Sequence, residues 1–156
     1  MAPCDLCGFP GEGRPAPVLE VATGALFADD GAREGFVGGA GRVYISPRLS
    51  VGPELAFIDG ERHTHVMLTG NLTMDLVRPA GRQPRPLTPF VVVGVGVFQT
   101  RTEVPSRASA TSYEGFLTVG GGLRASSGSR VVVGAEARTT GSTFSTFGFL
   151  GVRLGP

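Results

Sequence analysis

The sequence contains no lysine and no tryptophan, and it has only two cysteines and two histidines. All fourteen basic residues are arginine, and thirteen acidic residues bring the formal net charge to +1. A chain with so little excess charge lacks the basic surface that nucleic-acid binding requires. No apolar run reaches the length of about 20 residues that a membrane-spanning helix needs. The longest, residues 90–98, has the length of a strand.

Glycine and proline are abundant, with 25 and 12 residues, yet most glycines lie inside apolar runs such as VVVGVGVF. Glycine in that setting is typical of strands that bend or pack closely. No stretch keeps the apolar spacing of a helix. Residues 1–17 predict a flexible tail, and residues 18–156 predict one β-barrel domain. We expect eight strands, at residues 18–27, 35–46, 49–58, 65–77, 89–100, 113–124, 130–139 and 144–154.

Apolar and polar residues alternate along these segments. In the third, Leu49, Val51 and Leu55 share one face, while Ser50 and Glu54 lie on the other. Most segments have about ten residues, against a mean of about 5–6 for strands of soluble proteins. Ten tilted residues cross a bilayer. The pattern therefore predicts an all-β fold, an eight-stranded antiparallel up-and-down β-barrel of transmembrane type.

The polar face carries mostly small residues and a few charges at mid-strand. A soluble surface would carry a denser polar cover, and buried charges must pair. Four acids and three arginines nearly balance, and an eight-stranded barrel has room inside only for side chains. We therefore expect this face to line the lumen and the aliphatic face to meet lipid. The predicted lumen charge network, with a structural or gating role, consists of Glu20, Arg42, Glu54, Asp75, Arg124, Glu136 and Arg153.

Aromatic residues fall on both faces. Phe27, Phe57, Tyr113 and Phe144 lie near strand ends on the apolar face, which is consistent with an interfacial girdle. A second set falls on the polar face, where it would fill the lumen. This set is Phe36, Phe116, Phe147 and Phe149.

Several runs, including residues 44–55, 68–72, 90–98, 120–124 and 148–154, resemble small bacterial outer-membrane β-barrels of the OmpA/OmpX-like family. The resemblance covers about residues 18–156. It implies eight up-and-down strands, both termini on the periplasmic side, long loops outside, and a place in the bacterial outer membrane. No signal peptide is visible at the N-terminus, and we expect the export signal to be missing from this sequence.

Two small clusters suggest chemistry. Cys4 and Cys7 form a C-x-x-C pair, which with His63 and His65 makes a zinc site chemically possible. The favoured interpretation is a disordered or disulfide-paired tail. Lipid A deacylase barrels, which this chain resembles in size, use a His, a Ser and an acid. Here Glu61, His63 and Thr64 are expected to share one loop, and a polar extracellular loop is the favoured interpretation.

The sequence thus predicts an integral outer-membrane barrel with a structural, surface-interaction or minor pore role, without catalysis, cofactor or metal. The expected partners are outer-membrane lipid and an extracellular ligand bound through the loops, with no nucleic acid, and the expected state is a monomer. One alternative is a soluble lipocalin- or avidin-like barrel that holds a small apolar ligand. A second is an outer-membrane lipid-modifying hydrolase. The direction of the charged side chains, inward or outward, separates membrane from soluble barrels.

Overall fold

The computed structural model describes residues 16–28, 31, 33–59, 63–77, 87–102, 110–127, 130–141 and 143–154. Within these ranges the chain forms eight strands, and no helix there is long and apolar enough to cross a membrane. All eight predicted strands are present, and no bound is wrong by more than three residues. The strands are β1 (Val18–Phe27), β2 (Arg33–Tyr44), β3 (Leu49–Asp59), β4 (His63–Asp75), β5 (Thr88–Thr102), β6 (Ala110–Ser127), β7 (Val131–Thr140) and β8 (Thr143–Arg153).

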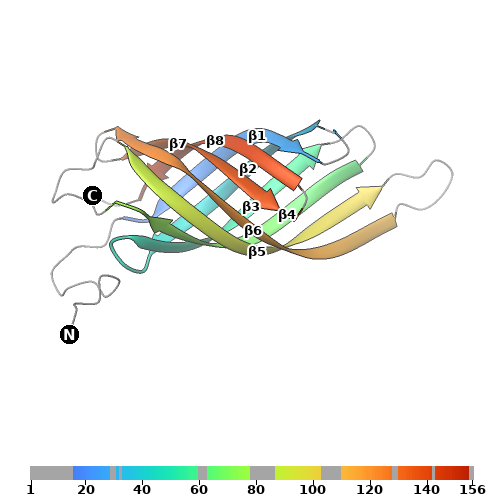
Figure 1. The fold of residues 1–156 in the computed structure, drawn as a ribbon, viewed down its shortest axis with the longest axis horizontal. Helices are drawn as coiled ribbons and strands as arrows, with labels where there is room; N and C mark the ends of the chain where they lie inside the picture. The colour runs from blue at the N-terminus through green and yellow to red at the C-terminus, as the bar shows by residue number, and fades with distance from the viewer. Residues whose placement is uncertain are drawn as a thin grey trace.

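Each strand pairs antiparallel with its neighbours in sequence, and β1 pairs with β8, so the sheet closes into a barrel (Figure 1). The closing register runs from Val18 opposite Arg153 to Phe27 opposite Phe144. One further hydrogen bond extends it, because the Leu154 N–H donates to the Pro17 carbonyl at 2.7 Å. The predicted fold class is confirmed. Of the predicted tail, residues 1–15 lie outside the described residues.

The two ends of the barrel differ in their connections. At one end, here called the terminal end, β1 begins, β8 ends, and residues 45–48, 76–87 and 128–130 connect strands. At the other, here called the loop end, the connections are residues 28–32, 60–62, 103–109 and 141–142. The longest connection therefore lies at the terminal end, so the two ends do not divide simply into short turns and long loops.

The β5–β6 hairpin reaches beyond its neighbours at the loop end (Figure 1). Its pairing extends to Thr102 opposite Ala110, whereas β7 pairs with β6 only as far as Thr140 opposite Thr118. The sequence predicted a loop from residue 101 to residue 112, and that prediction was too long. Its flanks are rich in threonine, which is polar but β-branched and favours strands.

The turn between β2 and β3 is wider than predicted. We expected β2 to continue to Ser46 and only Pro47 and Arg48 to turn, but β2 ends at Tyr44. The Ser46 hydroxyl accepts hydrogen bonds from the backbone N–H groups of Arg48 and Leu49, at 3.4 and 3.1 Å. A serine that binds backbone two and three residues ahead forms a turn and ends the strand.

Alternate residues face outward and inward around the whole barrel. Leu55, Leu72 and Val133, which would fill the centre of a soluble barrel, are 40–41% exposed. Glu54 is 6% exposed, and its neighbours on the inner face are mostly small residues. The apolar face therefore points outward, contrary to the lipocalin-like alternative. An exposed apolar belt of this extent is typical of a transmembrane barrel.

Glycine is required where strands approach most closely. A Cβ at Gly52 would meet the backbone carbonyl of Gly41 on β2. At Gly141, in the turn between β7 and β8, the backbone has a φ of 57°, which favours glycine. These two positions explain part of the high glycine content.

Candidate functional site: the lumen charge network

Six of the seven charged residues predicted to face the lumen are buried, at 3–7% exposure. Arg153 is only partly buried, and its Nη2 donates to Ser126 Oγ at 2.8 Å. Among the described residues, Arg153 belongs to neither of the two ion-pair groups described below. The six buried residues are Glu20, Arg42, Glu54, Asp75, Arg124 and Glu136.

The larger group, here called the central network, lies at mid-barrel. Arg42 Nε on β2 donates to Glu20 Oε2 on β1 at 2.9 Å, and Arg42 Nη2 lies 3.8 Å from Glu136 Oε2 on β7. Arg138 Nη2 lies 2.8 Å from Glu54 Oε2 on β3, and Arg138 Nε also donates to Glu136. Two arginines thus link three glutamates across four strands.

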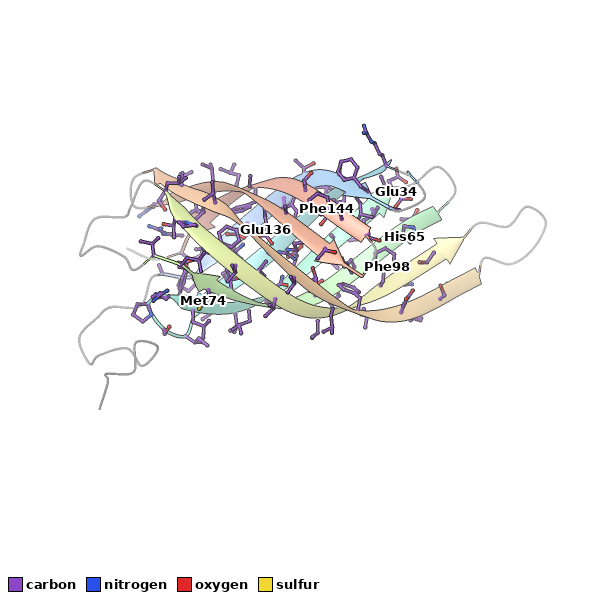
Figure 2. The ribbon with its side chains drawn as sticks, viewed as in Figure 1. Glu34, His65, Met74, Phe98, Glu136 and Phe144 are labelled. Carbon is purple, nitrogen blue, oxygen red and sulfur yellow. The ribbon has the colours of Figure 1, made fainter. Side chains whose placement is uncertain are left out.

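An amide completes the environment of Glu54. Asn71 Nδ2 on β4 donates to Glu54 Oε2 at 2.8 Å, so the same carboxylate oxygen accepts from β4 and from Arg138 on β7. Figure 2 places Glu136 inside the barrel, away from both ends. The network therefore spans the lumen at mid-barrel, where it ties five strands together.

The smaller group lies towards the terminal end. Arg124 Nη2 on β6 forms an ion pair with Asp75 Oδ1 on β4 at 2.7 Å. Arg124 Nη1 donates to the Tyr44 hydroxyl at 2.9 Å. Charge-assisted bonds of this length are stronger than neutral ones. This group joins β2, β4 and β6 where those strands reach the terminal end.

Phenylalanine rings separate and cover the charged groups. The Arg42 guanidinium lies 5.3 Å from the Phe90 ring centre and 5.5 Å from that of Phe149, and Arg124 lies 4.5 Å from Phe90. Guanidinium groups within about 6 Å of a ring centre gain cation–π attraction. Three of the four phenylalanines expected to fill the lumen are buried there, namely Phe36, Phe147 and Phe149, while Phe116 is partly buried.

Arg138, Asn71 and Tyr44 were missing from the predicted network. Arg138 lies two residues from Glu136 and next to the predicted strand end at residue 139. Residues two apart in a strand lie on the same face, so the position of Glu136 indicated that Arg138 also faces the lumen. Asn71 and Tyr44 carry no formal charge, so a search for balanced charges passes over them.

Little space remains directly beside the central network, on its loop-end side, among the residues that the structure describes. A cavity lined by Phe36, Phe116, Glu54 and Arg138, among others, has a volume of about 20 Å³. A buried water needs about 10–15 Å³ measured in this way. The side chains thus leave room for about one water at this level of the lumen.

The histidine cluster differs from its predicted form. His63 and Thr64 belong to β4 and not to a loop. The His65 ring faces the barrel interior at the loop end, where Nδ1 lies 2.9 Å from Thr100 Oγ1 and Nε2 lies 3.9 Å from Glu34 Oε2 (Figure 2). Cys4, Cys7 and Glu61 lie outside the described residues. In the part of the chain that the structure describes, no group of three metal-ligating side chains is found.

Solved structures share this architecture. The N-terminal β-barrel domain of Pseudomonas aeruginosa OprF aligns with a TM-score of 0.76 at 12% identity, over 92% of this chain and all of that one. The chain has the fold of the small outer-membrane β-barrels. Neisserial surface protein A aligns at 0.66 and 12% identity, over 88% and 94%. Ail of Yersinia pestis aligns at 0.55 and 11%, over 88% and 95%.

These barrels of the OmpA/OmpX type confirm the resemblance inferred from the sequence. At such low identity the likeness concerns the fold alone. No family model and no curated protein matches the sequence. The likeness extends to a designed transmembrane β-barrel, at a TM-score of 0.58 and 13% identity, over 91% and 98%.

Proposed function

We propose that the chain is an integral protein of the bacterial outer membrane, with a structural or surface-interaction role and no catalysis. Its outward apolar belt supports this placement, since a water-exposed surface of that kind would aggregate. The neighbours in fold are outer-membrane proteins, which supports the same compartment. In this proposal the terminal end faces the periplasm and the loop end faces the outside.

A role without conduction rests on one observation, the filled lumen. The central network and the Phe36–Phe147 pair, with ring centres 5.4 Å apart, leave only about 20 Å³ at their level. A hydrated ion needs a wider and continuous path. The charge network is then a structural element that holds the strands in register, and gating is the weaker interpretation.

Bilayer insertion is tested by adding the unfolded protein to phospholipid vesicles and floating the vesicles on a density gradient. We expect the folded barrel to float with the vesicles and to resist extraction by alkaline carbonate. A chain that stays folded and monomeric in buffer without detergent would contradict the membrane placement.

Conductance across vesicles or planar bilayers tests the absence of a pore. We expect no ion flux through the wild-type barrel above that of protein-free vesicles. Steady conductance that changes on Glu54→Ala or Arg124→Ala would replace the structural role with a gated pore.

The loop end is the surface we propose for extracellular contacts. A structure of Ail holds the heparin analogue sucrose octasulfate, which is a polyanion. Here the loop-end connections contain Asp29, Asp30, Glu61 and Glu103 against only Arg62 and Arg107. This balance does not favour a sulfated ligand. We expect no binding of sucrose octasulfate by calorimetry, and micromolar binding would contradict this charge argument.

A further inference from the structure

A cavity of about 800 Å³ opens at the loop end, on the outer side of the Phe36–Phe147 pair. Its apolar walls are Leu26 on β1, Met67 on β4, Phe98 on β5, and Phe116 with Leu117 on β6. This volume lies within the range of about 300–1,000 Å³ found for small-molecule pockets. Figure 2 shows Phe98 at the end of the barrel opposite Met74.

The floor of the cavity is mainly apolar. Leu26, Met67 and Phe98 pack against the buried cluster that contains Phe36 and Phe147. Beneath them lies the space of about 20 Å³. A molecule in the cavity therefore rests mainly on side chains that require no polar partner, and the narrow space beneath it leads to Glu54 and Arg138.

One side of the cavity is open. β7 stops pairing at Thr140 opposite Thr118, so the β6 segment of residues 110–117 has no β7 partner. Phe116 faces inward and Leu117 faces outward, with 72% of Leu117 exposed, yet both line the cavity. The cavity thus passes across the edge of β6, from the inside of the barrel to its outer face.

The outer face next to this opening is also apolar. Leu117 borders a second hollow of about 600 Å³, lined on β3 to β6 by Val51, Leu72, Val93 and Val95, among others. Apolar surface is therefore continuous from the outward belt, past Leu117, into the mouth of the barrel. A hydrocarbon chain can follow that path without exposure to water, and removal of apolar surface from water is favourable.

The described residues that line the outer part of the cavity include polar side chains and one charged side chain. Thr140 and Thr143 line the cavity at the end of the β7–β8 hairpin, and Glu114 is the charged residue among the lining. A carboxylate at this position repels an anionic headgroup. Hydroxyl groups suit a headgroup that is uncharged and rich in hydrogen-bonding atoms.

We propose that this mouth cavity binds an uncharged single-chain amphiphile, whose hydrocarbon chain enters from the outer leaflet past Leu117. The chain lies against Met67, Phe98 and Phe116, and the headgroup stays at Thr140 and Thr143. The flexible thioether of Met67 adapts to chains of different shape. This site rests on the proposed membrane placement.

The absence of tryptophan from the chain makes a site-specific test available. Three single-tryptophan variants are reconstituted in phospholipid bilayers, namely Phe98→Trp in the cavity, Leu150→Trp on the outward face of β8, and Phe90→Trp in the lumen. The probe is an alkyl maltoside with two bromine atoms on its chain, because bromine quenches indole fluorescence on contact.

We expect quenching of the Phe98→Trp variant to saturate at probe fractions where quenching of Leu150→Trp still rises linearly. Phe90→Trp, beneath the floor, stays unquenched. If Phe98→Trp does not fold, as judged by circular dichroism, Phe116→Trp reports from the opposite wall. Quenching that rises in parallel in the cavity and outward variants would overturn the proposal, because it would indicate simple partition into the bilayer.

Two glycines provide a matched pair for blocking the site. Both face outward: Gly115 lies beside Leu117 and lines the cavity at its lateral opening, whereas Gly148 lies on β8 and is not among the cavity's lining residues. A Cβ at either would lie 4.0 or 3.8 Å from the nearest backbone oxygen, so both tolerate a side chain. Added to Phe98→Trp, Gly115→Leu is expected to raise the half-saturating probe fraction at least about tenfold, and Gly148→Leu to leave it unchanged. Equal effects, or none, would overturn the site.

A bilayer of brominated phospholipid separates the two proposals. Quenching of Leu150→Trp by this bilayer supports the membrane placement, and its absence contradicts that placement and the cavity proposal together. When Leu150→Trp is quenched but the maltoside does not saturate Phe98→Trp, only the cavity proposal fails.

Discussion

Arg138 Nη2 and Glu54 Oε2 lie 2.8 Å apart, and this ion pair joins β7 to β3 across the lumen. The two residues are far apart in the sequence and belong to strands that do not pair with each other. The pair therefore crosses the interior directly, whereas backbone hydrogen bonds run only between neighbouring strands. The ion pair thus links two strands that share no backbone hydrogen bonds.

Removal of Arg138 is expected to be costly. In Arg138→Met, Glu54 and Glu136 lose their shared cation while they remain buried, and breaking a buried pair destabilises by about 3–5 kcal/mol. Urea unfolding of the vesicle-bound barrel measures the change. The exposed Arg101→Met is the control and should change stability by less than about 0.5 kcal/mol. Equal stability of the two variants would mean that the ion pairs contribute nothing.

The Arg124–Asp75 pair should be energetically separate from Glu54, which is paired with Arg138 on another part of the lumen wall. A double-mutant cycle with Arg124→Gln and Asp75→Asn is expected to give a coupling energy of about 1–3 kcal/mol, because the two atoms lie 2.7 Å apart. A cycle of Arg124→Gln with Glu54→Gln should give less than about 0.5 kcal/mol. Strong coupling in the second cycle would show that the lumen charges behave as one network.

Close strand contact at Gly52 predicts a steric effect. In Gly52→Ala the new methyl group meets the Gly41 carbonyl, which belongs to backbone and cannot rotate away. Overpacking of this kind costs about 1–3 kcal/mol. At Gly70 the nearest atom to a Cβ would be 3.9 Å away, so Gly70→Ala should leave the unfolding midpoint nearly unchanged. A tolerant Gly52 would indicate that β2 and β3 separate easily.

If the outward face contacts lipid, a charged substitution there should destabilise the barrel more near mid-membrane than near the membrane surface. Val93 is 46% exposed near the middle of β5, and Val93→Arg is expected to destabilise the barrel in vesicles by about 2–4 kcal/mol. Thr139 faces outward close to the end of β7, where the same arginine should cost only about 0–1 kcal/mol. Equal costs at both positions would contradict the proposed depth of insertion.

The fold was readable from the sequence because alternation marks a half-buried strand directly. Eight such segments of about ten residues fix both the number of strands and their facing, as Leu55 beside Glu54 illustrates. The errors lie at strand ends, where backbone hydrogen bonds decide. The Ser46 hydroxyl ended β2 early, and the threonines around residues 100–111 continued a hairpin that their polarity had suggested was a loop.

The partners within the site were not readable in the same way. Side chains alternate between the two faces of a strand, so the alternation alone was enough to place Glu20 and Arg42 inside the barrel. Pairing depends on height along the lumen, which follows from the tilt and stagger of all eight strands. For this reason Arg153 was grouped with charges that it does not meet, and Arg138 was left out although its parity matched.

The pairing of β1 with β8 joins the first and last strands of the chain. Ring closure therefore waits for the last strand, and an incomplete chain presents two open edges that lipid cannot satisfy. A chain truncated before Thr143 should have no stable membrane form and should aggregate through those edges. We therefore expect this barrel to fold all-or-none, because the other seven strands cannot close into a barrel without the eighth.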